Sequence, residues 1–395
     1  MVISIRSIET AVPPTSLPQH RVRDLFAAQP GLQRRSARLV RACFDHSGID
    51  VRHTVLDELG AAATDDGGVP AGAQGDGRFY DRGSGTLLSP PTGARNDLYV
   101  ARAPELFVAA ARAALDAADG LAAEDVTHVV TVSCTGFFAP GPEYRVVREL
   151  GLRTSTQRYH LGFMGCYAAF PALRMARDLC AADPGAVVLV VCAELCSLHL
   201  ASSDDPDTIV ASSVFADGAA AAVVSARPVG DGGPVLELDA FTTTLTDVGE
   251  QDMAWSIGDH GFEMVLSRYV PHIIGENIQG ALAPLLGSDL RPTDVARWAV
   301  HPGGRAILDK VQEALGLTDA QLRPSRETLR SYGNMSSPTV LFVLRRILHG
   351  LGAGLGAGPE DDAATPASGD RVCAMAFGPG LAVESALMTW RAEAG

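Results

Sequence analysis

Three residues far apart in the chain have the side-chain types of a cysteine-based acyl-transfer site. Cys166 follows Gly165 at the expected start of a helix, His301 ends a short apolar strand, and Asn334 lies in a Gly-Asn-Met-Ser turn. A cysteine attacks as its thiolate, and a helix N-terminus or a neighbouring imidazolium lowers the thiol pKa. An asparagine amide donates hydrogen bonds to a developing oxyanion. Together these types predict that Cys166 is a nucleophile served by His301 and Asn334.

Each of the three also has an ordinary structural interpretation. The chain has 7 cysteines, and free cysteines commonly pack as small hydrophobes. A histidine can cap the end of a strand, and an asparagine can stabilise a turn. The prediction of a site therefore depends on the motifs around these residues.

Composition narrows the class of protein. The 395 residues can bury a large core, and a net charge of -14 argues against non-specific nucleic-acid binding and against an anionic membrane surface. The same charge disfavours an acidic protein partner unless a local basic patch exists. The segment 20–46 locally reverses this acidity with Arg21, Arg23, Arg34, Arg35, Arg38 and Arg41, which form either a solvated helix face or a cluster that could hold a phosphorylated ligand.

Cysteine usage and hydropathy indicate a cytoplasmic protein. An odd number of irregularly spaced cysteines does not read as a disulfide framework, so a reducing compartment is expected. The N-terminus lacks the apolar run of a signal peptide, and we expect no membrane span. Neither a Cys-x-x-Cys pair nor a His-Glu-x-x-His helix occurs, so no metal and no cofactor is expected.

Buried strands alternating with helices indicate an α/β fold. The Gly- and Pro-rich residues 226–233 divide the chain into expected halves, 1–228 and 229–395. Residues 260–286 and 337–350 are predicted to be helices, the second with Ser337 as N-cap and Pro338 at its first position. Residues 61–97 and 352–370 are predicted to be long surface loops.

Several motifs occur in one order along the chain: Val214–Ala219 follows Gly165-Cys166, and then come His301-Pro-Gly-Gly304, Gly333-Asn-Met-Ser336 and Phe377-Gly-Pro-Gly380. Together they closely resemble the type III polyketide synthases, the chalcone synthase-like branch of the thiolase fold. The resemblance runs from about residue 2 to 390, with the two long loops outside it. It implies a homodimer of thiolase-like αβαβα five-layered subunits, each built of two related halves.

The resemblance also implies the reaction. Cys166, as a thiolate paired with protonated His301, would take a starter acyl group from acyl-CoA. Decarboxylation of malonyl-CoA would then leave an enolate, stabilised by donors from His301 and Asn334. No general base is needed because loss of carbon dioxide makes the carbanion. The chain would grow by two carbons per cycle and cyclise to a pyrone or an aromatic ring.

Further positions match those that hold substrates in the family. Phe215 and Met264 match its two gatekeepers between CoA tunnel and cavity. The other matches are Cys134, Thr135, Ala139, Cys196 and Ser336 for the cavity, and Gly303, Gly304, Ala306, Arg41 and Arg52 for CoA. Small residues at 135, 139 and 196 resemble bacterial alkylpyrone and alkylresorcinol synthases. They predict a medium- or long-chain acyl-CoA starter, since each buried methylene contributes about 0.8 kcal/mol.

Three alternatives stay open. One is a ketoacyl synthase that primes fatty acid synthesis and uses an acyl carrier protein. Another is a cysteine thioesterase or protease with the same three residues. The third is a non-catalytic thiolase-fold protein that serves as a binding partner. The Pro-Gly-Gly after His301 and the Met-Ser-Ser after Asn334 favour the polyketide synthase.

Overall fold

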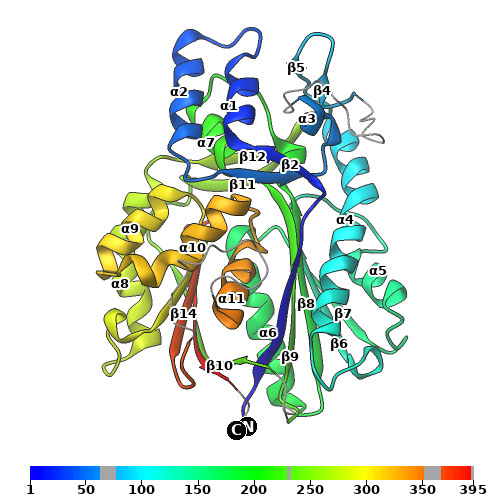
Figure 1. The fold of residues 1–395 in the computed structure, drawn as a ribbon, viewed down its shortest axis with the longest axis vertical. Helices are drawn as coiled ribbons and strands as arrows, with labels where there is room; N and C mark the ends of the chain where they lie inside the picture. The colour runs from blue at the N-terminus through cyan, green and yellow to red at the C-terminus, as the bar shows by residue number, and fades with distance from the viewer. Residues whose placement is uncertain (63–76, 229–232, 351–365, 393–395) are drawn as a thin grey trace.

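A nine-stranded sheet runs through the whole chain in the computed structural model, which describes residues 1–62, 77–228, 233–350 and 366–392 (Figure 1). One side of the sheet comes from the first half of the chain: β1 (Ser4–Ala11), β9 (Asp217–Ser225), β8 (Val187–Leu195), β6 (His128–Ser133) and β7 (Gln157–Gly162). The other side comes from the second half: β10 (Val235–Leu245), β15 (Ala382–Arg391), β14 (Arg371–Gly378) and β13 (Arg297–Val300).

Helices cover the outer face of each half of the sheet, and further helices lie between the two halves. The outer layers are α4 (Thr92–Asp116) with α5 (Pro142–Glu149), and α8 (Val270–Leu286) with α9 (Arg305–Leu315) and α10 (Asp319–Tyr332). The central layer is α6 (Ala169–Ala182) and α11 (Thr339–His349). Apolar side chains from the neighbouring helices and strands fill each space between two layers. Strands β8 and β9 are buried along their whole length. The expected five-layered αβαβα arrangement is confirmed.

The two sides of the sheet meet along only a short seam. β1 pairs with β10 at Ser4–Glu237 and Ile5–Leu236, and the strands then diverge. The wedge that opens between them receives α6 and α11 (Figure 1). Among the described residues, no helix is both long enough and apolar enough to cross a membrane.

Smaller elements form a cap over one end of these layers (Figure 1). They are α1 (Gln19–Ala27), α2 (Arg34–Asp45), α3 (Asp57–Ala62), α7 (Pro206–Val214) and the strand pairs β2 (Thr15–Pro18) with β3 (Val51–Thr54), β4 (Tyr80–Asp81) with β5 (Thr86–Leu87), and β11 (Met253–Gly258) with β12 (Gly261–Leu266). The predicted basic segment 20–46 is thus two helices, α1 and α2.

Two predictions in these regions were wrong. Residues 261–266 are a strand, because Phe262 and Met264 alternate with Glu263 and Val265 and pair with β11; the helix begins only at Val270. The described part of 61–97 is not a long loop, since it contains β4 and β5 and since α4 begins at Thr92.

The helix predicted at 337–350 begins at Thr339, after Pro338. Ser337 does not cap it, because its hydroxyl donates to the Glu194 carboxylate at 2.7 Å. Most of the predicted loop 352–370 lies outside the described residues, as does the boundary at 229–232.

Burial in the central layer predicts a large loss of stability on truncation. Phe170 on α6 is fully buried between the two sides of the sheet. Phe170→Ala should lower the free energy of unfolding by about 3–5 kcal/mol, because it removes apolar contacts and leaves a cavity. Chemical denaturation measures the change, with Val100→Ala on the exposed face of α4 as control. Equal losses in both variants would contradict the layer assignment.

Candidate active site

Cys166 lies in a single turn of 3-10 helix, Gly165–Tyr167, immediately before α6. It therefore precedes the first turn of the helix in which we expected it. Gly165 has a positive φ of 79°, and a Cβ there would lie 2.5 Å from Pro379. Only glycine fits this close approach, and its N–H donates to the Cys134 sulfur at 3.1 Å. The turn is thus fixed by the loop that follows β14 and by the end of β6.

Asn334 joins the two halves at the site. Its backbone N–H donates to Val214 at 2.8 Å, and its carbonyl accepts from Ala216 at 2.9 Å, so Asn334 forms a bridge with the intervening Phe215. Its side-chain oxygen accepts from the Ser336 N–H at 2.8 Å, and its amide donates to the Gly303 carbonyl at 3.3 Å.

Ser336 has a left-handed backbone, with a φ of 58°, which is uncommon for a residue with a Cβ. The conformation is held by Asn334 on one side and by the Thr339 hydroxyl, which donates to the Ser336 carbonyl at 2.9 Å. The side chains of Ser336 and Asn334 both hydrogen-bond to the Cys166 thiol. Three residues from two distant segments thus converge.

His301 directly continues the β13–β14 pairing, since its N–H donates to Met375 at 2.8 Å. Its ring is buried, and neither ring nitrogen has a hydrogen-bond partner within the described chain. A Cβ on Gly303 would lie 3.6 Å from the ring, so the glycine loop packs closely on it. Through that loop His301 is linked to Asn334.

Burial favours the neutral forms of both the thiol and the imidazole. It raises the pKa of Cys166 to about 11, although hydrogen bonds from Ser336 and Asn334 lower it. It lowers the pKa of His301 to about 3. The resting ion pair predicted from the sequence is therefore not favoured in the empty site: desolvation exceeds the effect of the helix N-terminus.

A cavity of about 440 Å³ opens in front of the Cys166 turn. Seven of the predicted site residues line it: Cys134, Thr135, Cys166, Cys196, Phe215, Met264 and Ser336. His301 and Asn334 are not part of that lining and lie behind it. Ala139 is exposed and also lies outside it.

The residues predicted to contact CoA are placed differently. Gly303 and Gly304 lie beside His301 and Val214, whereas Ala306 and Arg41 are exposed and outside the cavity lining. The prediction that Arg52 binds a CoA phosphate is not supported. Its guanidinium is buried and donates at 2.8 Å to the carbonyls of Ser212 and Phe215. Arg52 therefore holds the backbone at the C-terminal end of α7.

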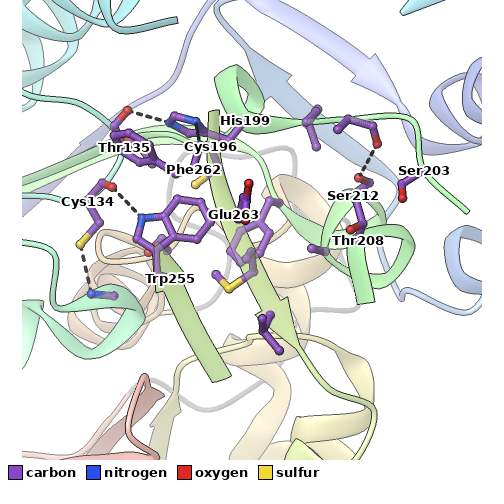
Figure 2. A pocket seen from close by; sticks show the side chains of 18 of the residues that line it. Cys134, Thr135, Cys196, His199, Ser203, Thr208, Ser212, Trp255, Phe262 and Glu263 are labelled. Atoms are coloured by element: carbon purple, nitrogen blue, oxygen red, sulfur yellow. Dashed lines mark hydrogen bonds between the residues drawn. The ribbon is translucent and has the colours of Figure 1, made fainter. Parts of the chain in front are cut away.

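An aromatic wall, which the sequence analysis missed, closes one side of the cavity (Figure 2). The His199 ring stacks on Phe262 at 4.2 Å, and Trp255 packs edge-on against both. His199 contacts the Thr135 carbonyl at 2.8 Å and accepts from the Phe262 N–H at 2.9 Å, while the Trp255 indole donates to Cys134 at 3.0 Å. Phe262 went unnoticed because 260–286 was assigned to a helix, and no strand was predicted around Trp255.

Glu194 was also missed, although one glutamate in the apolar run 187–195 was a visible signal. Burial raises the pKa of its carboxyl to about 7. It accepts hydrogen bonds from Cys134 N–H and Thr135 hydroxyl at 2.8 Å and from Ser337 hydroxyl at 2.7 Å. It thereby ties the cavity strand of one half to the Asn334 loop of the other.

Comparison with known proteins identifies the arrangement. Residues 84–228 match the N-terminal domain of chalcone and stilbene synthases, and residues 237–390 match the C-terminal domain. We had expected the resemblance to begin at about residue 2 and to leave out the two long loops. The matches instead begin at residue 84, and they include residues 84–97 and 352–370.

Individual relatives agree with these matches. The chain is 36% identical to bisdemethoxycurcumin synthase of Oryza sativa subsp. japonica over 318 residues. This alignment covers 78% of this chain and 75% of the relative. The crystal structure of PKS-I from the brown alga Ectocarpus siliculosus superposes with a TM-score of 0.84 at 30% identity and covers 98% of both chains. The C-terminal type III polyketide synthase domain of Steely1, a type I/III hybrid from Dictyostelium, superposes with a TM-score of 0.82 at 27% identity, over 98% of this chain and 99% of that one. The chain therefore belongs to the chalcone and stilbene synthase family, the type III polyketide synthases, whose members are acyltransferases that condense malonyl-CoA with a starter.

Proposed function

We propose that this enzyme loads a medium-chain fatty acyl group from CoA onto Cys166 and extends it with malonyl-CoA to an alkylpyrone or alkylresorcinol. The observation that carries the proposal is that the Ser336 and Asn334 side chains interact with Cys166, and that Cys166 lines one cavity together with Phe215 and Met264. Loading forms a thioester on Cys166 and breaks the bond from the acyl carbon to the CoA sulfur; neutral His301 takes the Cys166 proton and returns it to the departing CoA thiolate. His301, neutral again, then donates its ring N–H together with the Asn334 amide to the malonyl-derived enolate.

The cavity supports a starter of intermediate length. Cys134, Thr135 and Cys196 have small side chains that leave room in the cavity, but Trp255 and Phe262 fill space next to them. The volume of about 440 Å³ lies in the lower part of the usual range for small-molecule sites, about 300–1,000 Å³. Since the pantetheine arm must share this space, dodecanoyl and shorter chains fit better than palmitoyl, which narrows the starter predicted from the sequence.

We also infer that a homodimer completes the enzyme. Phe137 is 41% exposed although it packs on Phe163 and Phe262 of the aromatic wall. Ala139, close by in sequence, is exposed as well. A second copy over this face would remove these apolar groups from water. For CoA, Gly303 and Gly304 offer backbone beside the gate, and Arg41 is the exposed candidate for a phosphate.

The nucleophile assignment has a direct test. Cys166→Ala should fold normally and lose covalent loading, because no other thiol has the Ser336 and Asn334 contacts. Intact-protein mass spectrometry after incubation with octanoyl-CoA detects the acyl adduct, and Cys43→Ala, a half-buried cysteine of α2, is the control. Continued elongation by the Cys166 variant would show that the mechanism is wrong.

The role of His301 predicts a pH signature. Between the imidazole pKa of about 3 and the thiol pKa of about 11, internal proton transfer leaves the fraction of ion pair independent of pH. Alkylation of Cys166 by iodoacetamide should therefore change little between pH 6 and 9. In His301→Gln it should rise by about tenfold per pH unit, because the thiolate then forms only by loss of a proton to solvent. The same slope in both proteins would exclude His301 as the proton acceptor.

The aromatic wall predicts starter selectivity. The wild-type enzyme should use dodecanoyl-CoA better than palmitoyl-CoA, and Trp255→Ala should raise the relative kcat/KM for palmitoyl-CoA by about tenfold, because the lost indole leaves space for added methylenes. Trp255→Phe keeps a ring and is the matched control. Competition assays with malonyl-CoA measure the ratio. Preference of the wild type for coumaroyl-CoA over both fatty acyl starters would contradict the proposal.

A further inference from the structure

Arg95, in the first turn of α4, carries a charge that is fully buried and has no carboxylate partner among the described residues. Desolvation lowers the pKa of its guanidinium to about 10, and no neighbouring charge offsets that effect. A buried charge costs free energy unless its N–H groups find acceptors. The acceptors of its hydrogen bonds therefore define what Arg95 does.

The guanidinium of Arg95 is held by backbone carbonyls of two separate loops. Its Nε donates to the Pro90 carbonyl at 2.9 Å, just before α4. Its Nη1 donates to the carbonyls of Leu198 and Leu200, the second at 3.3 Å. These two carbonyls flank His199, which lines the active-site cavity together with Leu200. Arg95 thus fixes the backbone on both sides of a cavity residue.

The protonation state of His199 agrees with this arrangement. Its Nδ1 accepts from the Phe262 N–H at 2.9 Å, so the ring proton is on Nε2, which donates to the Thr135 carbonyl at 2.8 Å (Figure 2). Burial, together with the positive charge of Arg95, lowers the pKa of the imidazole to about 4. Only the neutral ring can keep both bonds, because a protonated ring has no acceptor for the Phe262 N–H.

The turn of the β11–β12 hairpin lies against the same end of α4. Gly261 in this turn has a φ of 121°, and a Cβ there would lie 3.0 Å from the Arg95 Nε. The Thr92 hydroxyl donates to the Gly258 carbonyl and accepts from the Gly261 N–H, the second at 2.9 Å. The first turn of α4 therefore holds the closed end of the hairpin that carries two rings of the aromatic wall.

From these contacts we infer that Arg95 is a positioning residue for starter selection. Together with Thr92 it holds the His199 segment and the hairpin turn in one arrangement, so that the aromatic wall limits the space for the acyl chain. Arg95 does not line the cavity itself, and its hydrogen bonds do not reach the Cys166 turn. The inference rests on the proposed function, because it concerns the length of the starter.

The test uses the full-length enzyme with two variants, Arg95→Lys and Thr92→Val. Lysine keeps the charge but lacks the planar fork that reaches both loops, and valine lacks the hydroxyl that holds the hairpin turn. Arg112→Lys, at an exposed arginine of the same helix that donates to the Glu149 carbonyl, is the matched control. Competition between dodecanoyl-CoA and palmitoyl-CoA measures selectivity, and alkylation of Cys166 by iodoacetamide measures the nucleophile separately.

Each variant should lower the kcat/KM ratio of dodecanoyl-CoA to palmitoyl-CoA by about fivefold, because a wall that is no longer held leaves space for added methylenes. Alkylation of Cys166 should stay within about twofold of the wild type. In a Trp255→Ala background the same substitutions should change the ratio by less than about twofold, since the wall that they position is already incomplete. Arg112→Lys should change neither quantity.

Two results would overturn the inference. One is an unchanged ratio in both Arg95→Lys and Thr92→Val, whatever their turnover. The other is a shift of the same size in the Trp255→Ala background, which would place the effect outside the aromatic wall. A wild type that prefers coumaroyl-CoA would instead overturn the proposed function. The variants are then compared on coumaroyl-CoA against benzoyl-CoA, where the same coupling to Trp255 is expected and its absence counts against Arg95.

Discussion

The site depends on a backbone bridge between the two halves of the chain. Asn334 is held through both its N–H and its carbonyl by the residues on either side of Phe215. Phe215 from the first half and Asn334 from the second are therefore held together. Glu194 adds a second tie, because its buried carboxyl joins Thr135 to Ser337. The nucleophile, its donors and the cavity wall are thus positioned by contacts between segments more than a hundred residues apart.

Burial decides the electrostatics of this junction. A cavity that excluded water only partly would allow a permanent thiolate, but here desolvation keeps both Cys166 and His301 neutral at rest. A neutral pair suits a reaction in which charge must appear only when substrate arrives. In the proposed mechanism, the enolate that follows decarboxylation is the principal charge in a site of low dielectric, where hydrogen bonds donated by Asn334 and His301 would be strongest.

Motifs with unusual backbone requirements were readable from the sequence, and residues defined by tertiary pairing were not. Gly165 before Cys166 could be interpreted because only glycine permits its positive φ beside Pro379. Arg52 was misassigned because a sequence does not show that an arginine is buried under Phe215. Trp255 and Phe262 were missed because strands β11 and β12 are short and pair with each other, and a short run containing apolar residues is hard to tell from the helix that follows by periodicity alone.

That docked hairpin is also the part of the site best suited to vary. Its inner face touches the cavity, and its hydrogen bonds outside the pair reach Cys134, His199, Ser89 and Thr92 and do not involve Asn334 or Cys166. A change of side chain at its inward positions alters cavity volume without disturbing the Asn334 bridge or the Cys166 turn, since those are held by the strands and central helices. Under the proposed function, catalysis and starter selectivity would therefore be carried by separate elements, and one catalytic arrangement would serve starters of different length.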